Sequence, residues 1–449
     1  MDRRDFLKIS GAGLAGAVLD SCVPDGGTKP AASQDGTDAG MEYRINNRSG
    51  DKVSLLGYGC MRWQMKKDEN GRDRIDQDIV NELVDYAMAH GVNYYDTSPA
   101  YLQGQSEKAA GIALARYPRK SFYLATKLSN FNNATPEASK QMYHDSFDQL
   151  QTDYFDYYLL HSIGSGGYPA FARRYEENGM MDFLLKEREA GRIRQLGFSF
   201  HGNQKAFDDF MALDSKYHWD FVQIEMNYVD WKHADGVRNV NADYLYEQLD
   251  KREIPITVME PLLGGRLARV PERVANRLKE RNPDGSLASW AFRFVGSYPR
   301  VLTALSGMTY MSDLVDNVKT FTGFKPMSEE ELAFMEEMAV LMKEYPTINC
   351  TDCRYCMPCP FGIDIPGIFA HYNACVNEGK VAHSAAQENY MKLRKQYLTT
   401  YSKAIPTLRQ ADHCIGCSQC NPHCPQSIDI PAELHRIDAY IEKLKRNTL

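Results

Sequence analysis

Between residues 41 and 326, eight short apolar segments alternate with helical segments, and this alternation constrains the fold more than any other feature. Strands that alternate with helices pair in parallel, because each helix carries the chain back across the sheet. The chain is therefore predicted to be an α/β protein with a (β/α)8 (TIM) barrel over this range. A doubly wound open sheet is less favoured, since no Gly-x-Gly-x-x-Gly turn follows the first strand. The expected strands cover residues 54–61, 92–97, 122–127, 155–161, 193–199, 221–226, 256–260 and 301–306.

Eight of the chain's 11 cysteines stand in two runs near its end. In each run the first three cysteines are separated from one another by two residues, and the run closes with Cys-Pro. Three thiolates from one short loop suit one face of an iron–sulfur cluster, with a more distant Cys-Pro as the fourth ligand. The spacing favours two [4Fe–4S] clusters, while two tetrathiolate zinc sites or disulfides are the alternatives. The expected ligands are Cys350, Cys353, Cys356, Cys359, Cys414, Cys417, Cys420 and Cys424.

The two runs resemble the motif of bacterial two-cluster ferredoxins, with one departure. Cys356 and Cys359 are separated by two residues, where the ferredoxin motif has three. The resemblance implies crossed ligation, so that Cys424 completes the cluster of the first run and Cys359 that of the second. A small, mainly helical ferredoxin-like domain is expected over residues 350–449, joined to the barrel by a helix over residues 327–349.

The amino terminus is typical of an export signal. Residues 1–22 begin with the twin-arginine pair Arg3-Arg4 and continue with a short apolar stretch, which is too short to span a membrane comfortably. The signal ends in a box resembling a lipoprotein cleavage site, which makes Cys22 the candidate for a lipid anchor. Residues 23–40 are rich in small and polar residues and are predicted to form a flexible linker. The protein is therefore expected in the periplasm or anchored to the membrane.

Polar residues at the ends of three successive predicted strands form a candidate catalytic group. Asp96 ends the second strand, Lys127 the third and His161 the fourth, and Tyr101 follows the second strand closely. Reacting groups of such barrels lie at the carboxyl ends of the strands. A phenol with a pKa of about 10 is a weak acid at neutral pH, and a neighbouring cation is expected to lower that value. The group suits carbonyl reduction, with Tyr101 as the acid, Lys127 and Asp96 as its activators, and His161 on the carbonyl oxygen.

These motifs resemble those of the aldo/keto reductase family. The resemblance covers residues 43–325 and rests on segments 91–97, 125–127 and 156–161 together with Tyr101. With the cysteine runs and the export signal, the chain is similar to bacterial members that carry a C-terminal ferredoxin domain. The resemblance implies NAD(P)(H) bound without a Rossmann motif.

The nucleotide contacts implied by the resemblance match less well. Phe200 and Met259 stand where the family often has Asn and a stacking Tyr. Asp313 stands where an Arg is frequent, so a 2′-phosphate would be repelled and NADH is favoured over NADPH. The implied contacts are Ser199 and Gln223 at the carboxamide, Gly264 at the pyrophosphate and Asn317 on the adenine side.

Two functions fit these features. The first is an exported oxidoreductase acting on a small carbonyl or alcohol, whose clusters exchange electrons with a redox partner protein or a membrane electron carrier. The second is a non-catalytic 4Fe–4S electron-transfer protein that uses the barrel as a docking scaffold. A net charge of -7 gives no basic surface for nucleic acid.

Overall fold

The structure is a computed structural model, and it describes residues 40–234 and 239–449. Eight parallel strands close into a barrel in the cyclic order β3-β6-β7-β8-β9-β10-β11-β12. The predicted (β/α)8 barrel is confirmed. Its strands are β3 (Leu56–Gly59), β6 (Tyr94–Asp96), β7 (Tyr123–Leu128), β8 (Phe155–Ile163), β9 (Ile193–Phe200), β10 (Phe221–Glu225), β11 (Ile256–Met259) and β12 (Val301–Ser306).

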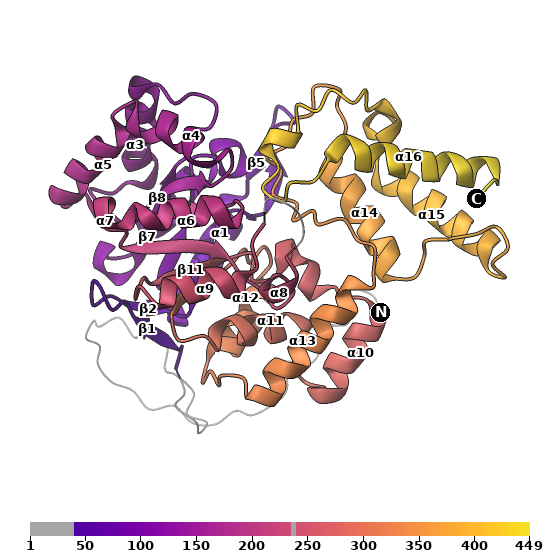
Figure 1. Cartoon of the computed structure of the whole chain (residues 1–449), viewed down its shortest axis with the longest axis horizontal. Coiled ribbons are helices and arrows are strands. Elements are labelled where there is room, and N and C mark those ends of the chain that lie inside the picture. Colours follow the sequence, from indigo (N-terminus) through magenta and orange to yellow (C-terminus); the bar gives the residue numbers. More distant parts are fainter. Residues whose placement is uncertain (1–39, 235–238) are drawn as a thin grey trace, which may run out of the picture. The chain divides into compact units, whose positions relative to one another are not determined.

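Helices surround the strands on the outside of the barrel (Figure 1). Four of them begin at a side chain that accepts a hydrogen bond from the first turn, namely Thr135, Asn203, Ser286 and Ser328. The helices are α1 (Gln77–Ala89), α2 (Ser106–Leu114), α3 (Pro136–Leu150), α4 (Gly167–Phe171), α5 (Met180–Glu189), α6 (Gln204–Ala212), α7 (Asp214–Tyr217), α8 (Asp230–His233), α9 (Ala242–Asp250), α10 (Glu272–Arg281), α11 (Leu287–Gly296), α12 (Met311–Phe321) and α13 (Glu329–Lys343).

The barrel strands are apolar along nearly their whole length because both of their faces are covered. Every residue of β8 except Ser162 is buried. Parallel strands covered by helices on one side and by barrel side chains on the other read as continuous apolar runs. The interior is filled by a separate group of apolar residues that includes Tyr94, Tyr157 and Phe221.

Two antiparallel hairpins accompany the barrel, β1 (Tyr43–Ile45) with β2 (Lys52–Ser54), and β4 (Met65–Lys67) with β5 (Asp73–Ile75). The first hairpin places Val53 against the apolar side chains inside the barrel. The predicted helix over residues 327–349 is shorter, since Ser328 caps α13 and the helix ends at Lys343. Its apolar face packs into the barrel core through Phe334 and Met338.

The cysteine region is mainly helical and has an apolar core of its own. Its helices α14 (Ile365–Asn377), α15 (Tyr390–Ala404) and α16 (Ile430–Arg446) contact one another (Figure 1). Asp364 and Asp429 cap α14 and α16 directly after the two Cys-Pro steps, so the internal repeat gives the same local structure twice. The core between the helices is distinct from that of the barrel.

The predicted export signal (residues 1–22), the lipid-anchor candidate Cys22 and almost all of the predicted linker lie outside the described residues. Within the described part of the chain, none of the helices combines the length and apolar character needed to cross a membrane.

Candidate active site at the barrel mouth

The four residues of the predicted catalytic group meet at the carboxyl ends of adjacent strands. Asp96 ends β6, Lys127 and His161 lie in β7 and β8, and Tyr101 begins the turn η1 (Tyr101–Gly104) after β6. The Lys127 ammonium donates to the Asp96 carboxylate and, at 3.0 Å, to the Thr97 carbonyl. All four side chains are buried. The structure therefore assembles the group as the strand order predicts.

Lys127 and Asp96 form a buried ion pair whose geometry is fixed by a third side chain. Gln223 Nε2 donates to the second Asp96 oxygen at 3.1 Å. Burial lowers the pKa of Lys127, and the Asp96 carboxylate opposes that effect. Such a pair holds its charges only because each polar atom finds a partner.

Tyr101 differs from the sequence-based expectation in one respect. Its ring lies beneath the Lys127 ammonium, which is 5.1 Å from the ring centroid. Burial, followed by the negative charge of Asp96, places the pKa of Tyr101 well above its usual value. The pKa of Tyr101 is therefore raised overall and not lowered as expected, because desolvation of the phenolate is the largest effect on it.

His161 is held as a neutral imidazole. Burial and then the nearby Lys127 charge place its pKa well below the usual value. Its Nδ1 lies 2.6 Å from Ser129 Oγ and 3.2 Å from Ser98 Oγ. The Ser98 hydroxyl also accepts from the Ala100 amide and lies 2.8 Å from the Ser129 hydroxyl. When the two serine hydroxyls donate toward the ring, Nδ1 is the acceptor and Nε2 carries the hydrogen.

The Nε2 atom of His161 faces a residue of the other domain. Tyr355, between the predicted cluster ligands Cys353 and Cys356, places its hydroxyl 3.4 Å from Nε2. Sequence reasoning missed Tyr355, Ser98 and Ser129. Both serines follow strands that end in predicted catalytic residues, which is a usable signal, but no local pattern relates Tyr355 to the barrel.

The four residues predicted to contact the nucleotide are engaged with other parts of the chain. Three make hydrogen bonds through their side chains, and the fourth, Gly264, is covered by another segment. Ser199 Oγ accepts from the Ser162 amide at 2.7 Å, and Asn317 Nδ2 donates to Ser306 Oγ at 2.8 Å. Gln223 donates to Asp96, as described above, and Gly264 lies against the backbone of Thr351. At Gly264 the barrel mouth is covered by the backbone of Thr351.

The eight predicted cluster ligands fall into two groups. None of the cysteines in the described ranges forms a disulfide. Cys424 lies near enough to raise the pKa values of Cys350, Cys353 and Cys356, after the larger effect of burial. The pKa of Cys420 is raised in the same way by Cys414, Cys417 and Cys359. These are the groups that crossed ligation requires, with Cys424 and Cys359 exchanged between the runs.

Zinc and iron–sulfur clusters place different demands on their cysteine ligands. Within residues 40–234 and 239–449, no three His, Cys, Asp or Glu side chains converge on one position suitable for a metal ion. A zinc ion draws four sulfur atoms to about 2.3 Å, whereas a cluster spreads its ligands around a larger body. Burial raises the pKa of Cys350 to about 11 and that of Cys356 to about 12. Binding of iron to these thiols would therefore release protons.

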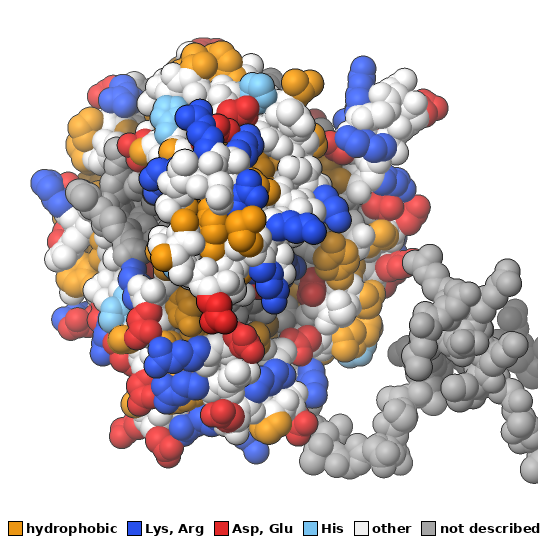
Figure 2. Space-filling view, turned by 90° about the vertical axis from the view of Figure 1, so that its right-hand side faces the viewer, with side chains coloured by type: hydrophobic (Ala, Val, Ile, Leu, Met, Phe, Trp, Pro, Cys, Tyr) orange, Lys and Arg blue, Asp and Glu red, His pale blue; other side chains and the backbone are white. Residues whose placement is uncertain are grey.

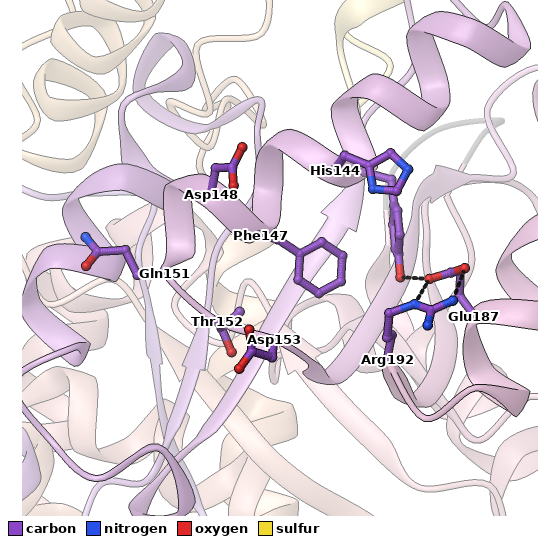
Figure 3. A pocket seen from close by; sticks show the side chains of 9 residues that line it. His144, Phe147, Asp148, Gln151, Thr152, Asp153, Glu187 and Arg192 are labelled. Atoms are coloured by element: carbon purple, nitrogen blue, oxygen red, sulfur yellow. Dashed lines mark hydrogen bonds and ion pairs between the residues drawn. The ribbon is translucent and has the colours of Figure 1, made fainter.

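A surface groove of about 530 Å³ lies on the outside of the barrel, away from these groups (Figure 3). It is bordered by α3 and by the ion pair of Glu187 with Arg192. Tyr143 donates to Glu187 at 2.8 Å, so Tyr143, Glu187 and Arg192 are paired with one another. None of the predicted site residues lines this groove.

A closed barrel with a buried Asp, Lys, Tyr and His group at its mouth, followed by two groups of four cysteines, defines an oxidoreductase joined to an iron–sulfur domain. Residues 55–339 match the aldo/keto reductase family, and the chain belongs to that family. Residues 349–428 match the 4Fe-4S dicluster domain, which supports two clusters over the zinc and disulfide alternatives.

Individual relatives are distant. Protein tas of Escherichia coli is 30% identical over 195 residues, which cover 37% of this chain and only 53% of that protein. L-galactose dehydrogenase of Arabidopsis thaliana is 22% identical, over 67% of this chain and 94% of that enzyme. Both are compatible with family membership.

Solved structures show the same fold. Aldo-keto reductase AKR11C1 from Bacillus halodurans superposes with a TM-score of 0.53 at 21% identity, covering 66% of this chain and 96% of that one. An aldo-keto reductase from Klebsiella pneumoniae, solved in complex with NADPH, gives a TM-score of 0.52 at 20% identity, over 67% of this chain and 96% of that one.

Proposed function

We propose that this protein is an exported iron–sulfur oxidoreductase that interconverts a carbonyl group and an alcohol at the barrel mouth. The observation that supports the proposal most directly is the buried group of Asp96, Lys127, His161 and Tyr101. Export rests on the twin-arginine pattern of the sequence, which would bring the folded protein to the periplasm or, through Cys22, to the membrane surface.

In this proposal His161 orients the substrate and Tyr101 moves the proton. The Nε2–H of neutral His161 donates to the substrate oxygen, and the Tyr101 hydroxyl delivers a proton to that oxygen as negative charge develops. The raised pKa of Tyr101 keeps the phenol protonated until then. Lys127, whose charge is held by Asp96, stabilises the phenolate that remains.

A nicotinamide dinucleotide, when bound, would supply or accept the hydride. Ser199, Gln223, Gly264 and Asn317 are the residues proposed to hold it, once Thr351 no longer covers Gly264. NADH is preferred in this proposal because Asp313, in the first turn of α12, would repel a 2′-phosphate. The NADPH complex of the Klebsiella pneumoniae reductase supports a nicotinamide cofactor for this fold.

The clusters are proposed to exchange single electrons with a redox partner protein or a membrane electron carrier. The Cys350 group lies beside the mouth, since Tyr355 contacts His161 and Gln426 donates to Glu225 at 2.6 Å. In the second group Cys417 is exposed to solvent. Electrons would therefore pass between the partner and the mouth through the second cluster and then the first.

Replacement of Tyr101 tests the proposed chemistry. Tyr101→Phe in the holoprotein, purified anaerobically, is expected to lower turnover of a carbonyl panel with NADH by about 10²–10⁴-fold, because the proton donor is lost. Cluster absorbance and iron content should be unchanged. The matched control is Tyr244→Phe, which removes an exposed hydroxyl bonded to Asp208. Activity retained in Tyr101→Phe would exclude Tyr101 as the acid.

A non-catalytic electron carrier is the alternative function. It is favoured by the covered mouth, in which Tyr355 and Thr351 occupy positions that a substrate and a dinucleotide would need. The same assay separates the two functions. A fully iron-loaded wild-type protein that turns over no carbonyl or alcohol with NADH, NADPH, NAD⁺ or NADP⁺ would favour the carrier.

A further inference from the structure

One segment of the iron–sulfur domain, residues 347–356, lies on the barrel mouth, and we call it the docking segment. It contains three of the predicted cluster ligands. It contacts the barrel at three places: Arg266, the pair of Arg62 and Gly264, and His161. The last two coincide with the proposed positions of the dinucleotide and of the substrate oxygen.

At the end of the docking segment that contacts His161, Tyr355 lies where the substrate oxygen would bind. Its hydroxyl lies 3.4 Å from His161 Nε2, the atom assigned to hold that oxygen. Its ring lies beside Phe131 and His161, with centroid separations of 6.3 Å and 6.2 Å. A carbonyl cannot reach His161 while the Tyr355 hydroxyl occupies this place, since two oxygen atoms cannot share one position.

In the middle, Thr351 fills the space at Gly264. A Cβ placed on Gly264 would come within 2.7 Å of the Thr351 carbonyl carbon, so the two backbones are in direct contact. Arg62 donates to the Thr351 carbonyl and pairs with Asp352 at 3.8 Å. Gly264 has a φ of +68°, which a residue with a side chain rarely adopts. Because Gly264 has no side chain, the backbone of the docking segment can approach it this closely.

The docking is held by polar contacts rather than by a shared core. Arg266 donates to Asn349 Oδ1 at 2.9 Å and to Thr347 Oγ1 at 2.6 Å. The apolar cores of the barrel and of the iron–sulfur domain are separate, so undocking divides neither core. Polar interfaces within a chain resemble transient ones, which open and close.

We propose that the docking segment competes with the dinucleotide and the carbonyl substrate for the barrel mouth. When the segment is docked, Tyr355 occupies the place of the substrate oxygen at His161 and Thr351 covers Gly264. Either ligand then binds with an affinity reduced by the fraction of molecules that are undocked. The competition rests on the proposed function for the identity of its ligands. Because the segment carries predicted cluster ligands, a change at the clusters would alter ligand binding at the mouth, and ligand binding would alter the clusters in return.

The test is a binding measurement on the oxidised holoprotein, with NAD⁺ and NADP⁺ as probes in equilibrium dialysis. The double variant Thr347→Val/Asn349→Ala removes two partners of Arg266 and leaves every barrel residue intact. Loss of two hydrogen bonds to a guanidinium is expected to tighten nucleotide binding by about tenfold or more. The matched control, Thr400→Val/Asn389→Ala on α15, should bind as the wild type does. Iron content is measured in each protein.

Hydrogen exchange on the wild type gives a second readout that needs no variant. Amides of residues 347–356 should exchange faster when the nucleotide is bound, because the segment leaves the mouth. Slower exchange would show a lid that closes over the ligand and would overturn the competition. Equal, measurable affinities of wild type and double variant would also overturn it, leaving the proposed function intact. Absence of nucleotide binding in every protein would overturn both.

Discussion

The charges of Lys127 and Asp96 lie where water does not reach, with side-chain exposures of 0% and 2%. Removing one partner of such a pair leaves an uncompensated buried charge, which costs more than the pair itself contributes. Lys127 also donates to the Thr97 carbonyl and Asp96 also accepts from Gln223, so each charge has one further constraint on its position. Its role in the site is therefore to place a fixed cation beside Tyr101.

Lys127→Met is expected to lower the free energy of unfolding of the barrel by about 3–5 kcal/mol, because Asp96 is left buried and unpaired. The double variant Lys127→Met/Asp96→Asn should lose clearly less, since neither group is then charged. Urea unfolding followed by far-UV circular dichroism measures both. A double variant as unstable as the sum of the two single variants would contradict this account.

At the scale of elements, α2 anchors the loop that presents Tyr101. Ser106, at its first position, donates to the Cys60 carbonyl at 2.7 Å and lies 2.8 Å from the Thr97 hydroxyl. Between β6 and α2, Leu102 and Gln103 both adopt left-handed φ values of 50° and 57°. That conformation costs a residue with a side chain about 1–2 kcal/mol, so the loop depends on its anchored ends.

A second residue of α2, Glu107, gives a pH-dependent test. It accepts from Thr126 at 2.5 Å, and burial raises its pKa to about 7. The folded protein then keeps a proton between about pH 4.5 and 7 that the unfolded chain releases, so the unfolding free energy falls as pH rises across this range, by up to about 1.4 kcal/mol per pH unit. Glu107→Gln should remove that contribution. Identical pH slopes in urea unfolding of the two proteins would contradict the assignment.

At the scale of the whole molecule, the first cysteine group lies beside the mouth and the second is open to solvent. Apolar side chains next to the second group are exposed, with Phe361 at 43%, Leu408 at 78% and Ile415 at 66%. Figure 2, which faces the side on the right of Figure 1, shows apolar groups bordered by lysine and arginine side chains. Exposed apolar residues beside an accessible cluster are suited to brief contact with an electron-transfer partner.

Leu408→Glu/Ile415→Glu is therefore expected to slow electron transfer from the dithionite-reduced protein to a c-type cytochrome by about tenfold, since apolar contact beside the second cluster is lost. Stopped-flow absorbance measures the rate. The control, Met391→Glu, changes a residue that is 61% exposed in the first turn of α15, whereas Leu408 follows the last turn of that helix. An equal loss of rate in the control would indicate a general charge effect instead.

The sequence alone was sufficient to predict the barrel and most of its site. All eight predicted strands occur in the closed sheet, with shifts of a few residues, because buried parallel strands leave continuous apolar runs in the sequence. The catalytic group was predictable because carboxyl ends of neighbouring parallel strands must meet. The contact of Tyr355 with His161 was not predicted, since no local pattern encodes a contact across 194 residues. The contact of Ser129 with His161 was also missed, although Ser129 follows a strand that carries a predicted catalytic residue.

The fold class, the catalytic group and the grouping of the cysteines follow from periodicity and spacing, which are local properties of the sequence. Three further points follow only from the tertiary structure: the raised pKa of Tyr101, the serine hydroxyls beside His161 Nδ1 and the occupation of the barrel mouth by residues 347–356. Each depends on burial or on contact between segments far apart in the chain. Desolvation and the exclusion of one group by another arise only when those segments meet in space.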